Sequence, residues 1–482
     1  MYASSEINIG NTSLGGNSPV RIQSMTTTKT MDTVATVNQV ANLAKAGCDF
    51  VRITTQNINE ANNLKVIKEE LGKIGIYIPL IADVHFIPKI AELAAQFVEK
   101  VRINPGNYID SQSSISEKLI PLLSVCKKHN TAIRIGVNHG SLSETILYKY
   151  GNTALGMVES LMEFVRVCKK HNFNKLVLSV KASNVVMMID ANKLLVEKLL
   201  IEGLNYPIHL GVTEAGSEDE GRVKSASGIG YLLAHGIGDT IRVSLSEDPV
   251  AEIPVAKMLV DFYGKRLDIA KRIPHELIRV AIKFFSGKPP LVLTSGMSGL
   301  ADYSNHNESI NLDIGKKKYG ISKLVYHNLS IEELIIRATV DATILLLNNE
   351  TDGIWIENNS STTDDQNAKL SLEILQVLGL RISKTEFIAC PTCGRSSVVL
   401  VDLLQEVKKQ TSHIRGLKIA VMGCSVNGPG EMADADYGMV GTGNGNVDLY
   451  KGRKLIHKNI KQEQSIDALI NLIKNSGDWK NK

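Results

Sequence analysis

The sequence predicts an α/β protein with three parts: a (β/α)8 TIM barrel, a small α/β insert and a C-terminal α+β domain. Two observations carry this prediction. The first half of the chain repeats eight times a short strand rich in β-branched residues, a polar turn and an amphipathic helix. Beyond that repeat, a stretch with strands and helices of its own leads to a segment that holds three of the six cysteines.

The domain boundaries are placed where these patterns change. With 482 residues the chain is long enough for two or three hydrophobic cores. We expect the barrel over residues 1–251, the insert with a linker helix over 252–380, and the cysteine domain over 381–482. Within the middle part we expect a helix over Leu370–Leu380 and strand or helix pieces over Leu291–Thr294, Ala342–Leu347 and Gly353–Glu357.

Eight strands are predicted in the barrel, each followed by a helix. In the first helix Asp32 is expected to cap the N-terminus and Gly47 to end it. Val34, Val37 and Ala41 are expected on its buried face. The predicted strands are Val20–Met25, Phe50–Thr54, Ile78–Asp83, Val98–Asn104, Ala132–Val137, Leu176–Lys181, Ile208–Thr213 and Thr240–Leu245.

Four of these strands carry an arginine between β-branched residues. Because helices cover the outside of a barrel, such an arginine is expected to point into the lumen. Several cations in one cavity repel each other unless an anion joins them, and guanidinium groups match phosphate oxygens. Each arginine could instead pair with a glutamate, but four in one context favour a phosphate or diphosphate site. They are Arg52, Arg102, Arg134 and Arg242.

Polar residues follow at the carboxyl ends of the strands, where barrel active sites lie. Asn104, Asn138 and Ser244 continue the inward-facing positions beyond three of the arginines. Other polar groups at the same ends are Asp83 and His85 at the third strand, Lys181 at the sixth, and Glu214 after the seventh.

The C-terminal cysteines are the other chemical signal. Cys390 and Cys393 form a Cys-x-x-Cys pair on a Pro/Gly turn, and Cys424 arrives on a second Gly-rich loop. Three thiolates are one short of a closed zinc or iron–sulfur site. We expect Glu431 to supply a fourth, weaker ligand to a reactive iron. The alternative is a structural zinc knuckle completed by a histidine such as His413.

Composition limits the other functions. The net charge of +4 is small for this length and gives no sign of a nucleic acid or membrane partner. The first residues lack the pattern of a signal peptide, and no apolar run is long enough to span a bilayer. We therefore expect a cytoplasmic protein, in which Cys48, Cys126 and Cys168 are buried as small apolar residues.

Several sequence blocks carry a resemblance to a known family. In the barrel, Ala82-Asp-Val-His-Phe, Val101-Arg-Ile-Asn-Pro-Gly-Asn and Val212-Thr-Glu-Ala-Gly are among them, and Cys424-Ser-Val-Asn-Gly-Pro-Gly-Glu continues them near the end. The resemblance that these blocks mark extends over roughly three quarters of the chain. The chain resembles the 4-hydroxy-3-methylbut-2-enyl diphosphate synthases, iron–sulfur oxidoreductases of the non-mevalonate isoprenoid pathway.

The resemblance implies a reaction and a set of site residues. It implies reductive ring opening and dehydration of 2-C-methyl-D-erythritol 2,4-cyclodiphosphate through a [4Fe–4S] cluster, with flavodoxin or ferredoxin as electron donor. Cys390, Cys393, Cys424 and Glu431 would hold the cluster. Glu214, Asp83, His85 and Asn427 would be catalytic. Arg52, Arg102, Asn104, Arg134, Asn138, Lys181, Arg242 and Ser244 would bind substrate.

The middle of the chain departs from the common two-domain form of that family. The insert looks like a shortened version of a larger one in its long form. In the two-domain form the cluster domain closes over the barrel of a partner in a homodimer, whereas in the long form closure is within one chain. Two rival interpretations are a non-redox diphosphate-binding barrel with a structural zinc domain and a barrel enzyme acting on a pterin diphosphate.

Overall fold

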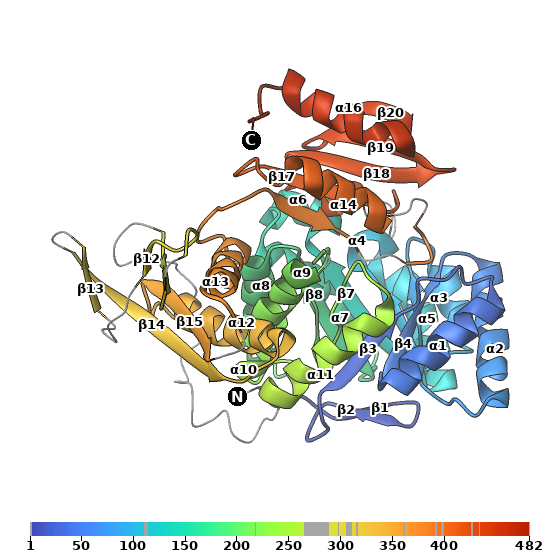
Figure 1. Ribbon diagram of the computed structural model, residues 1–482. Helices are drawn as coiled ribbons and strands as arrows, with labels where there is room; N and C mark the ends of the chain where they lie inside the picture. Colours follow the sequence, from blue (N-terminus) through green and yellow to red (C-terminus); the bar gives the residue numbers. More distant parts are fainter. Residues whose placement is uncertain are drawn as a thin grey trace.

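The computed structural model contains an eight-stranded parallel sheet, two five-stranded sheets and a two-stranded hairpin within its described part (Figure 1). The structure describes residues 2–109, 114–216, 218–264, 289–296, 298–304, 311–314, 317–359, 362–390, 393–396, 400–425, 428–432 and 434–481.

The eight-stranded sheet is the predicted barrel. Its order is β8-β7-β6-β5-β4-β3-β10-β9, and a parallel bridge between Leu178 and Ile208 joins its two ends. All eight predicted strands are present, so the predicted fold class is confirmed. They are β3 (Arg21–Met25), β4 (Phe50–Thr55), β5 (Leu80–Val84), β6 (Lys100–Ile103), β7 (Ala132–Asn138), β8 (Leu176–Lys181), β9 (His209–Leu210) and β10 (Thr240–Ile241).

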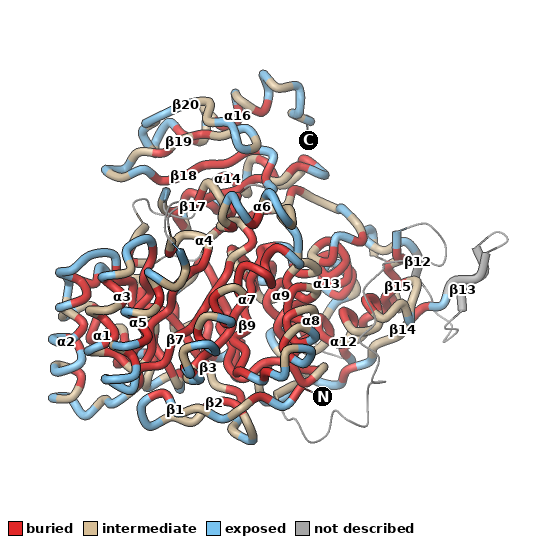
Figure 2. Tube along the Cα trace, turned by 180° about the vertical axis from the view of Figure 1, so that it is seen from behind, coloured by how far each residue is buried: buried red, intermediate tan, exposed pale blue. Residues whose placement is uncertain are grey.

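Helices surround the barrel, and Figure 2 shows buried strands inside a partly exposed ring of helices. The first helix has the predicted ends, since the Asp32 side chain accepts from the Ala35 N–H and Gly47 is left-handed at φ 101°. Val34 is 72% exposed, so its predicted burial was wrong. The main helices are α1 (Thr33–Ala46), α2 (Ile58–Lys73), α3 (Pro88–Ala94), α5 (Ile115–His129), α7 (Ala154–Lys170), α8 (Val185–Ile201), α9 (Glu218–Ser225) and α10 (Tyr231–Ala234).

Both ends of the barrel are covered. Short helices α4 (Pro105–Tyr108) and α6 (Glu144–Tyr150) follow β6 and β7 at the carboxyl end. At the other end, the hairpin of β1 (Ile7–Ile9) and β2 (Thr12–Leu14) packs Ile9 and Leu14 against barrel residues such as Phe50. The amino end of the barrel is thereby filled with apolar side chains, and the carboxyl end is left for chemistry.

Helix α11 (Glu252–Tyr263) packs against β3 and supplies Glu252 to the barrel wall. It follows β10 and therefore serves as the eighth barrel helix. We propose that the barrel domain extends through Tyr263 instead of ending at residue 251, because α11 packs on β3 and its Glu252 pairs with Arg242 of the barrel.

The insert is a small sheet with two helices on the barrel. Its strand order is β12-β11-β15-β14-β13, and β11 and β15 begin where predicted. Helix α12 (Ile331–Leu347) comes so close to the barrel that a Cβ on Gly230 would lie 2.2 Å from Val340 Cγ2. The other elements are β11 (Leu291–Thr294), β12 (Tyr303–Ser304), β13 (Asn311–Ile314), β14 (Lys317–His327), β15 (Gly353–Asn359) and α13 (Asp364–Val377).

The C-terminal domain is a mixed sheet in the order β16-β17-β18-β19-β20, with the two helices α14 and α16 packed on it. Within the described helices of the chain, none combines the length and apolar character that crossing a membrane requires. The elements are β16 (Glu386–Ala389), α14 (Leu400–Thr411), β17 (Lys418–Met422), α15 (Gly428–Glu431), β18 (Tyr437–Gly443), β19 (Asn446–Lys451), β20 (Lys454–Lys461) and α16 (Gln462–Asn475).

This domain lies over the carboxyl end of the barrel of its own chain (Figure 1). A parallel bridge joins Ala215 of the barrel to Ala389. The Lys29 ammonium donates to the Gly394 carbonyl at 2.9 Å, and the Ser246 hydroxyl donates to the Cys390 carbonyl at 3.1 Å. The described contacts thus close the barrel mouth within one chain, the arrangement expected for the long form.

Candidate functional site

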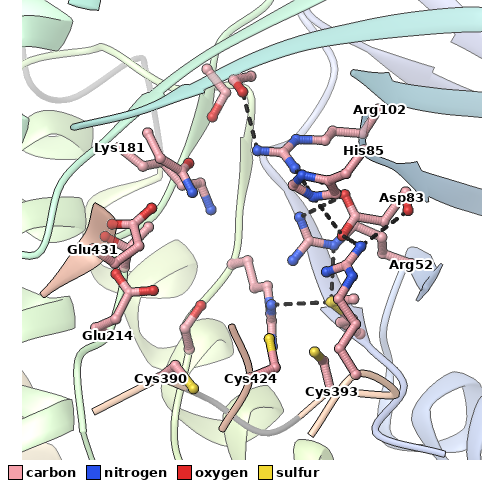
Figure 3. A pocket seen from close by; sticks show the side chains of 18 of the residues that line it. Arg52, Asp83, His85, Arg102, Lys181, Glu214, Cys390, Cys393, Cys424 and Glu431 are labelled. Carbon is pink, nitrogen blue, oxygen red and sulfur yellow. Dashed lines mark hydrogen bonds and ion pairs between the residues drawn. The ribbon is translucent and has the colours of Figure 1, made fainter. Parts of the chain in front are cut away.

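A cavity lies between the barrel mouth and the C-terminal domain. Of the 16 predicted site residues, 14 line it. Figure 3 shows two facing walls. One holds Arg52, Asp83, His85 and Arg102, the other holds Lys181, Glu214 and Glu431, and the three cysteines lie along one end. The 14 are Arg52, Asp83, His85, Arg102, Arg134, Asn138, Lys181, Glu214, Arg242, Ser244, Cys390, Cys393, Cys424 and Glu431.

Of the two remaining predicted residues, Asn104 does not line the cavity. Asn104 is fully buried behind its wall, where its side chain accepts from the Gly106 N–H and donates to the Ser141 hydroxyl. It caps α4, so its amide is committed to holding that turn. Asn427 lies outside the described residues.

One wall is a buried network around Asp83. Arg102 donates to the Asp83 carboxylate at 3.2 Å and to His85 Nε2 at 2.6 Å, and Arg52 lies 3.9 Å from Asp83. Although burial alone would raise it, the pKa of Asp83 lies well below its usual range because Arg52, Arg102 and Arg395 surround it. Asp83 therefore stays ionised and holds the arginines in place.

His85 is neutral in this network. Burial first, then Arg395 and Arg102, lower the pKa of His85 to about 3. Its Nε2 accepts from Arg102, so its proton is on Nδ1, which faces the Asn107 amide at 3.0 Å. For the Nδ1–H of His85 to donate to Asn107, the amide oxygen of Asn107 must be the atom that faces the ring. That oxygen has no other partner in the described structure, which agrees with this orientation. His85 thus positions Arg102.

The lumen holds cations without matching anions. Arg134 is 1% exposed, and its Nε and Nη1 atoms find no partner in the described structure. Burial, followed by repulsion from other cations, lowers the pKa of both Arg134 and Lys181 well below the ordinary value. An anion in the cavity would relieve this repulsion and take up the free N–H groups.

Arg242, unlike Arg134, already has a carboxylate partner in the part of the chain that the structure describes. Its guanidinium donates to both Glu252 oxygens, at 3.0 and 3.3 Å, and both residues are buried. The structural pairing considered as the alternative for each arginine is therefore found at Arg242. Its guanidinium still lines the cavity, but with part of its charge already balanced.

On the other wall two carboxyl groups meet. The Glu431 side chain forms side-chain hydrogen bonds with Asn138 and Glu214. Burial and the charge of Glu214 raise the pKa of Glu431 well above its usual value, and burial also raises the pKa of Glu214. Both carboxyl groups are thereby biased toward the protonated form. Glu214 has φ 50°, a strained left-handed conformation that places its side chain at the mouth.

The cysteines surround one end of the cavity. Cys390 lies at the end of β16 and accepts from the Gly423 N–H at 3.2 Å, while Cys424 follows β17. Burial raises the pKa of Cys390 well above its usual range, and the nearby Cys393 and Cys424 raise it further. A cationic metal centre reverses that penalty by favouring thiolates, so this donor set suits a bound metal.

The histidine suggested as a zinc ligand, His413, does not line the cavity. Within the described residues, no three His, Cys, Asp or Glu side chains are gathered closely enough for one metal ion. A zinc ion draws four ligands to roughly 2.3 Å of one point, whereas each iron of a cluster takes its own thiolate. His413 instead lies 2.7 Å from the Lys480 carbonyl.

Arg395 is a site residue that sequence reasoning missed. Its guanidinium donates to the Asp83 carboxylate at 3.0 Å and to the Asp83 carbonyl at 3.2 Å. Burial opposes its charge, but Asp83 and Cys393 raise its pKa. Arg395 follows Cys393 by two residues, so the Cys-Pro-Thr-Cys-Gly-Arg motif could have identified it as a candidate site residue. Arg395 connects the cysteine loop to the arginine wall.

Two family models match the chain. The GcpE TIM-barrel domain matches residues 4–257, and the GcpE protein C-terminal domain matches residues 386–475. Residues 258–385, where the insert lies, are outside both models.

Relatives named 4-hydroxy-3-methylbut-2-en-1-yl diphosphate synthase (flavodoxin) are similar over nearly the full chain. The protein from Phocaeicola vulgatus is 40% identical, with 99% of this chain and 98% of the relative covered. The one from Porphyromonas gingivalis is also 40% identical, with 98% and 97% covered. The alignment with the Phocaeicola vulgatus protein spans 604 positions, whereas this chain has 482 residues. At least 122 residues of that relative therefore have no counterpart in this chain.

Solved structures resemble the chain only distantly. The dihydropteroate synthase of Burkholderia cenocepacia gives a TM-score of 0.38 at 12% identity, covering 53% of this chain and 96% of that chain. A likeness this low supports no conclusion about function.

Proposed function

We propose that this chain, which belongs to the GcpE family, is an oxidoreductase that converts 2-C-methyl-D-erythritol 2,4-cyclodiphosphate to 4-hydroxy-3-methylbut-2-enyl diphosphate. The observation that carries the proposal is one cavity that is lined both by several buried cations and by three cysteines. The reaction takes up two electrons and two protons, opens the ring and releases water. It needs an anion site, an electron source and proton-bearing groups side by side.

Cys390, Cys393, Cys424 and Glu431 would hold a [4Fe–4S] cluster, which supplies single electrons and an iron that accepts oxygen ligands. Three half-buried thiols and one buried carboxyl group that line a single cavity fit this group. Carboxylate is a harder ligand than thiolate and a weaker one for cluster iron, so Glu431 is the ligand that gives way most easily.

The diphosphate is bound by the cations of the lumen. Arg134 and Lys181 are buried, and two Arg134 nitrogens have no partner within the described structure, whereas Arg102 is fixed by Asp83 and His85. Binding a diphosphate replaces repulsion among these groups by attraction, and the fixed network lowers the cost of orienting them. The substrate ring then lies toward the cysteine end of the cavity.

Burial raises the pKa of Glu214, so its carboxyl group can hold a proton next to that position. We infer that Glu214 donates a proton from its carboxyl oxygen to the leaving hydroxyl group, with Asn138 orienting Glu431. Asp83 remains ionised beside Arg52, Arg102 and Arg395, so it orients cations and substrate hydroxyls and does not donate protons.

Flavodoxin is the electron donor that the relatives' names give, and we propose that a flavodoxin also serves this chain. We further propose that the reaction takes place in the cytosol, because a reducing compartment keeps the three cysteines as thiols.

Close packing of two backbone turns holds Glu431 against the barrel. A Cβ on Gly430 would lie 1.9 Å from the Gly140 carbonyl oxygen, and one on Gly140 would lie 2.5 Å from the Glu431 nitrogen. We expect Gly430→Ala to push the domains apart and lower kcat/KM about 100-fold, as a displacement of ~1 Å does at an active site. Steady-state assays and small-angle X-ray scattering would measure both effects.

The matched control is Gly299→Ala, because an added Cβ there meets nothing within 4 Å. It should leave rate and dimensions unchanged. A Gly430→Ala protein with the same kcat/KM and radius of gyration would show that this contact does not set the position of Glu431.

The proposed function is tested by supplying the cyclodiphosphate and a chemical reductant to protein purified without oxygen. We expect stoichiometric 4-hydroxy-3-methylbut-2-enyl diphosphate, identified by mass spectrometry. Binding of the cyclodiphosphate without any product under reducing conditions would favour the non-redox diphosphate-binding barrel.

A further inference from the structure

The last strand of the C-terminal sheet carries positive charge that the cavity does not use. Residues 451–461 contain five Lys or Arg and no Asp or Glu. The whole chain has a net charge of only +4, so this one segment exceeds it. Charge gathered in this way produces a local potential that the net charge conceals. The five are Lys451, Arg453, Lys454, Lys458 and Lys461.

These side chains are available to a partner. All five are exposed. The ion pairs of the C-terminal domain in the described part of the chain involve other cations, namely Lys384, Arg395, Lys408, Lys409 and Lys418. Half-buried Leu455 and Ile456 lie among the charges. We call residues 451–461 the basic edge.

The basic edge is connected to the cysteine loops through the sheet. β20 is an edge strand that pairs with β19 alone in its sheet. The register runs from Met422 to Val440, from Val440 to Asp448, and from the neighbouring Val447 to Ile460. Met422 lines the cavity two residues before Cys424. Three strand spacings, about 15 Å, therefore separate the backbone of the basic edge from the cavity wall.

We propose that the basic edge is the docking surface for an acidic one-electron carrier protein of the flavodoxin type. This inference rests on the proposed function, which requires electrons from a carrier. An acidic protein is attracted by these five exposed cations, and such steering raises association rates for transient complexes. Complexes of this kind use small interfaces, for which one strand and its turn are large enough.

Lysines on an edge strand have another common role, since they prevent sheets from pairing edge to edge. The two roles differ in what they predict for the carrier. A protective role requires only that β20 be charged, of either sign, whereas docking of an acidic carrier requires positive charge. Charge reversal therefore separates them.

The test is the triple variant Arg453→Glu/Lys454→Glu/Lys458→Glu of the cluster-loaded protein. We expect KM for reduced flavodoxin to rise roughly ten-fold or more at low ionic strength, and its salt dependence to flatten or reverse. The rate with photoreduced 5-deazariboflavin, a small neutral reductant that needs no docking surface, should be unchanged.

The matched control reverses three exposed lysines at the opposite end of the barrel, Lys45, Lys128 and Lys170, in the last turns of α1, α5 and α7. It makes the same change in net charge and should leave KM for flavodoxin near the original value.

Two outcomes contradict different claims. If the triple variant keeps the original KM and salt dependence with flavodoxin, or if the control variant loses affinity equally, the basic edge is not the docking surface. If the unaltered protein forms no product with either reduced flavodoxin or photoreduced 5-deazariboflavin, the proposed function fails.

Discussion

We expect Cys424→Ser to abolish cluster binding and to lower product formation by more than about 1000-fold. A thiolate is a soft ligand that suits the iron of a cluster, whereas a serine hydroxyl is neither soft nor ionised at neutral pH. Cys424 lines the cavity with Cys390 and Cys393. Without it, two thiolates and the Glu431 carboxylate are too few to hold four irons. Iron and sulfide analysis with a parallel activity assay would measure this.

The control is Cys126→Ser, which removes a thiol far from the cavity. Cys126 is buried on α5, and burial raises its pKa, so it behaves as a small apolar residue. This variant should lose stability and keep its iron. If the Cys424→Ser protein retained full iron and sulfide, Cys424 would not be a ligand.

The second large effect is expected for Arg134→Met. Arg134 has two donor nitrogens without a partner in the described structure and is repelled by Arg52 and Arg102. Removing it deletes charge-assisted hydrogen bonds to the diphosphate, so kcat/KM should fall roughly 100-fold or more. Removing it also relieves repulsion, so the melting temperature should stay the same or rise. Kinetics and thermal unfolding, each measured with and without substrate, would show both effects.

Arg166→Met provides the contrast. Arg166 lies on the outer helix α7 and pairs with Glu159 and Glu202 at 3.2 and 2.6 Å. Its loss should slightly lower stability and leave kcat/KM unchanged. An Arg134→Met protein that melts at a lower temperature but binds the cyclodiphosphate normally would assign Arg134 a structural role instead.

The barrel could be predicted from the sequence because its signals are local. β-Branched runs such as Leu176–Lys181 mark strands, and Asp32 and Gly47 mark helix ends. Strand ends were less predictable. β9 stops at Leu210 instead of Thr213, and the next residue, Gly211, lies so close to the β8 side chain of Lys181 that an added Cβ would be 2.3 Å from its Nζ. That contact joins neighbouring strands and is invisible in either one.

Site residues could be predicted where they belong to a motif or to the inward-facing positions of a barrel strand. They could not be predicted where they depend on packing between separate elements. The pairing of Arg242 with Glu252 requires the position of α11 on the barrel. The bond from Arg395 to Asp83 joins residues 312 apart and requires the C-terminal domain to close over the mouth. Nothing local in the sequence encodes either distance.

The central claim is that three thiolates and the Glu431 carboxylate bind a [4Fe–4S] cluster facing an anion site. It is tested most directly by metal and sulfide analysis, with absorption spectra, of protein purified without oxygen. The account predicts a brown protein with about four irons and four sulfides per chain. A colourless protein with about one zinc per chain and no sulfide would contradict it.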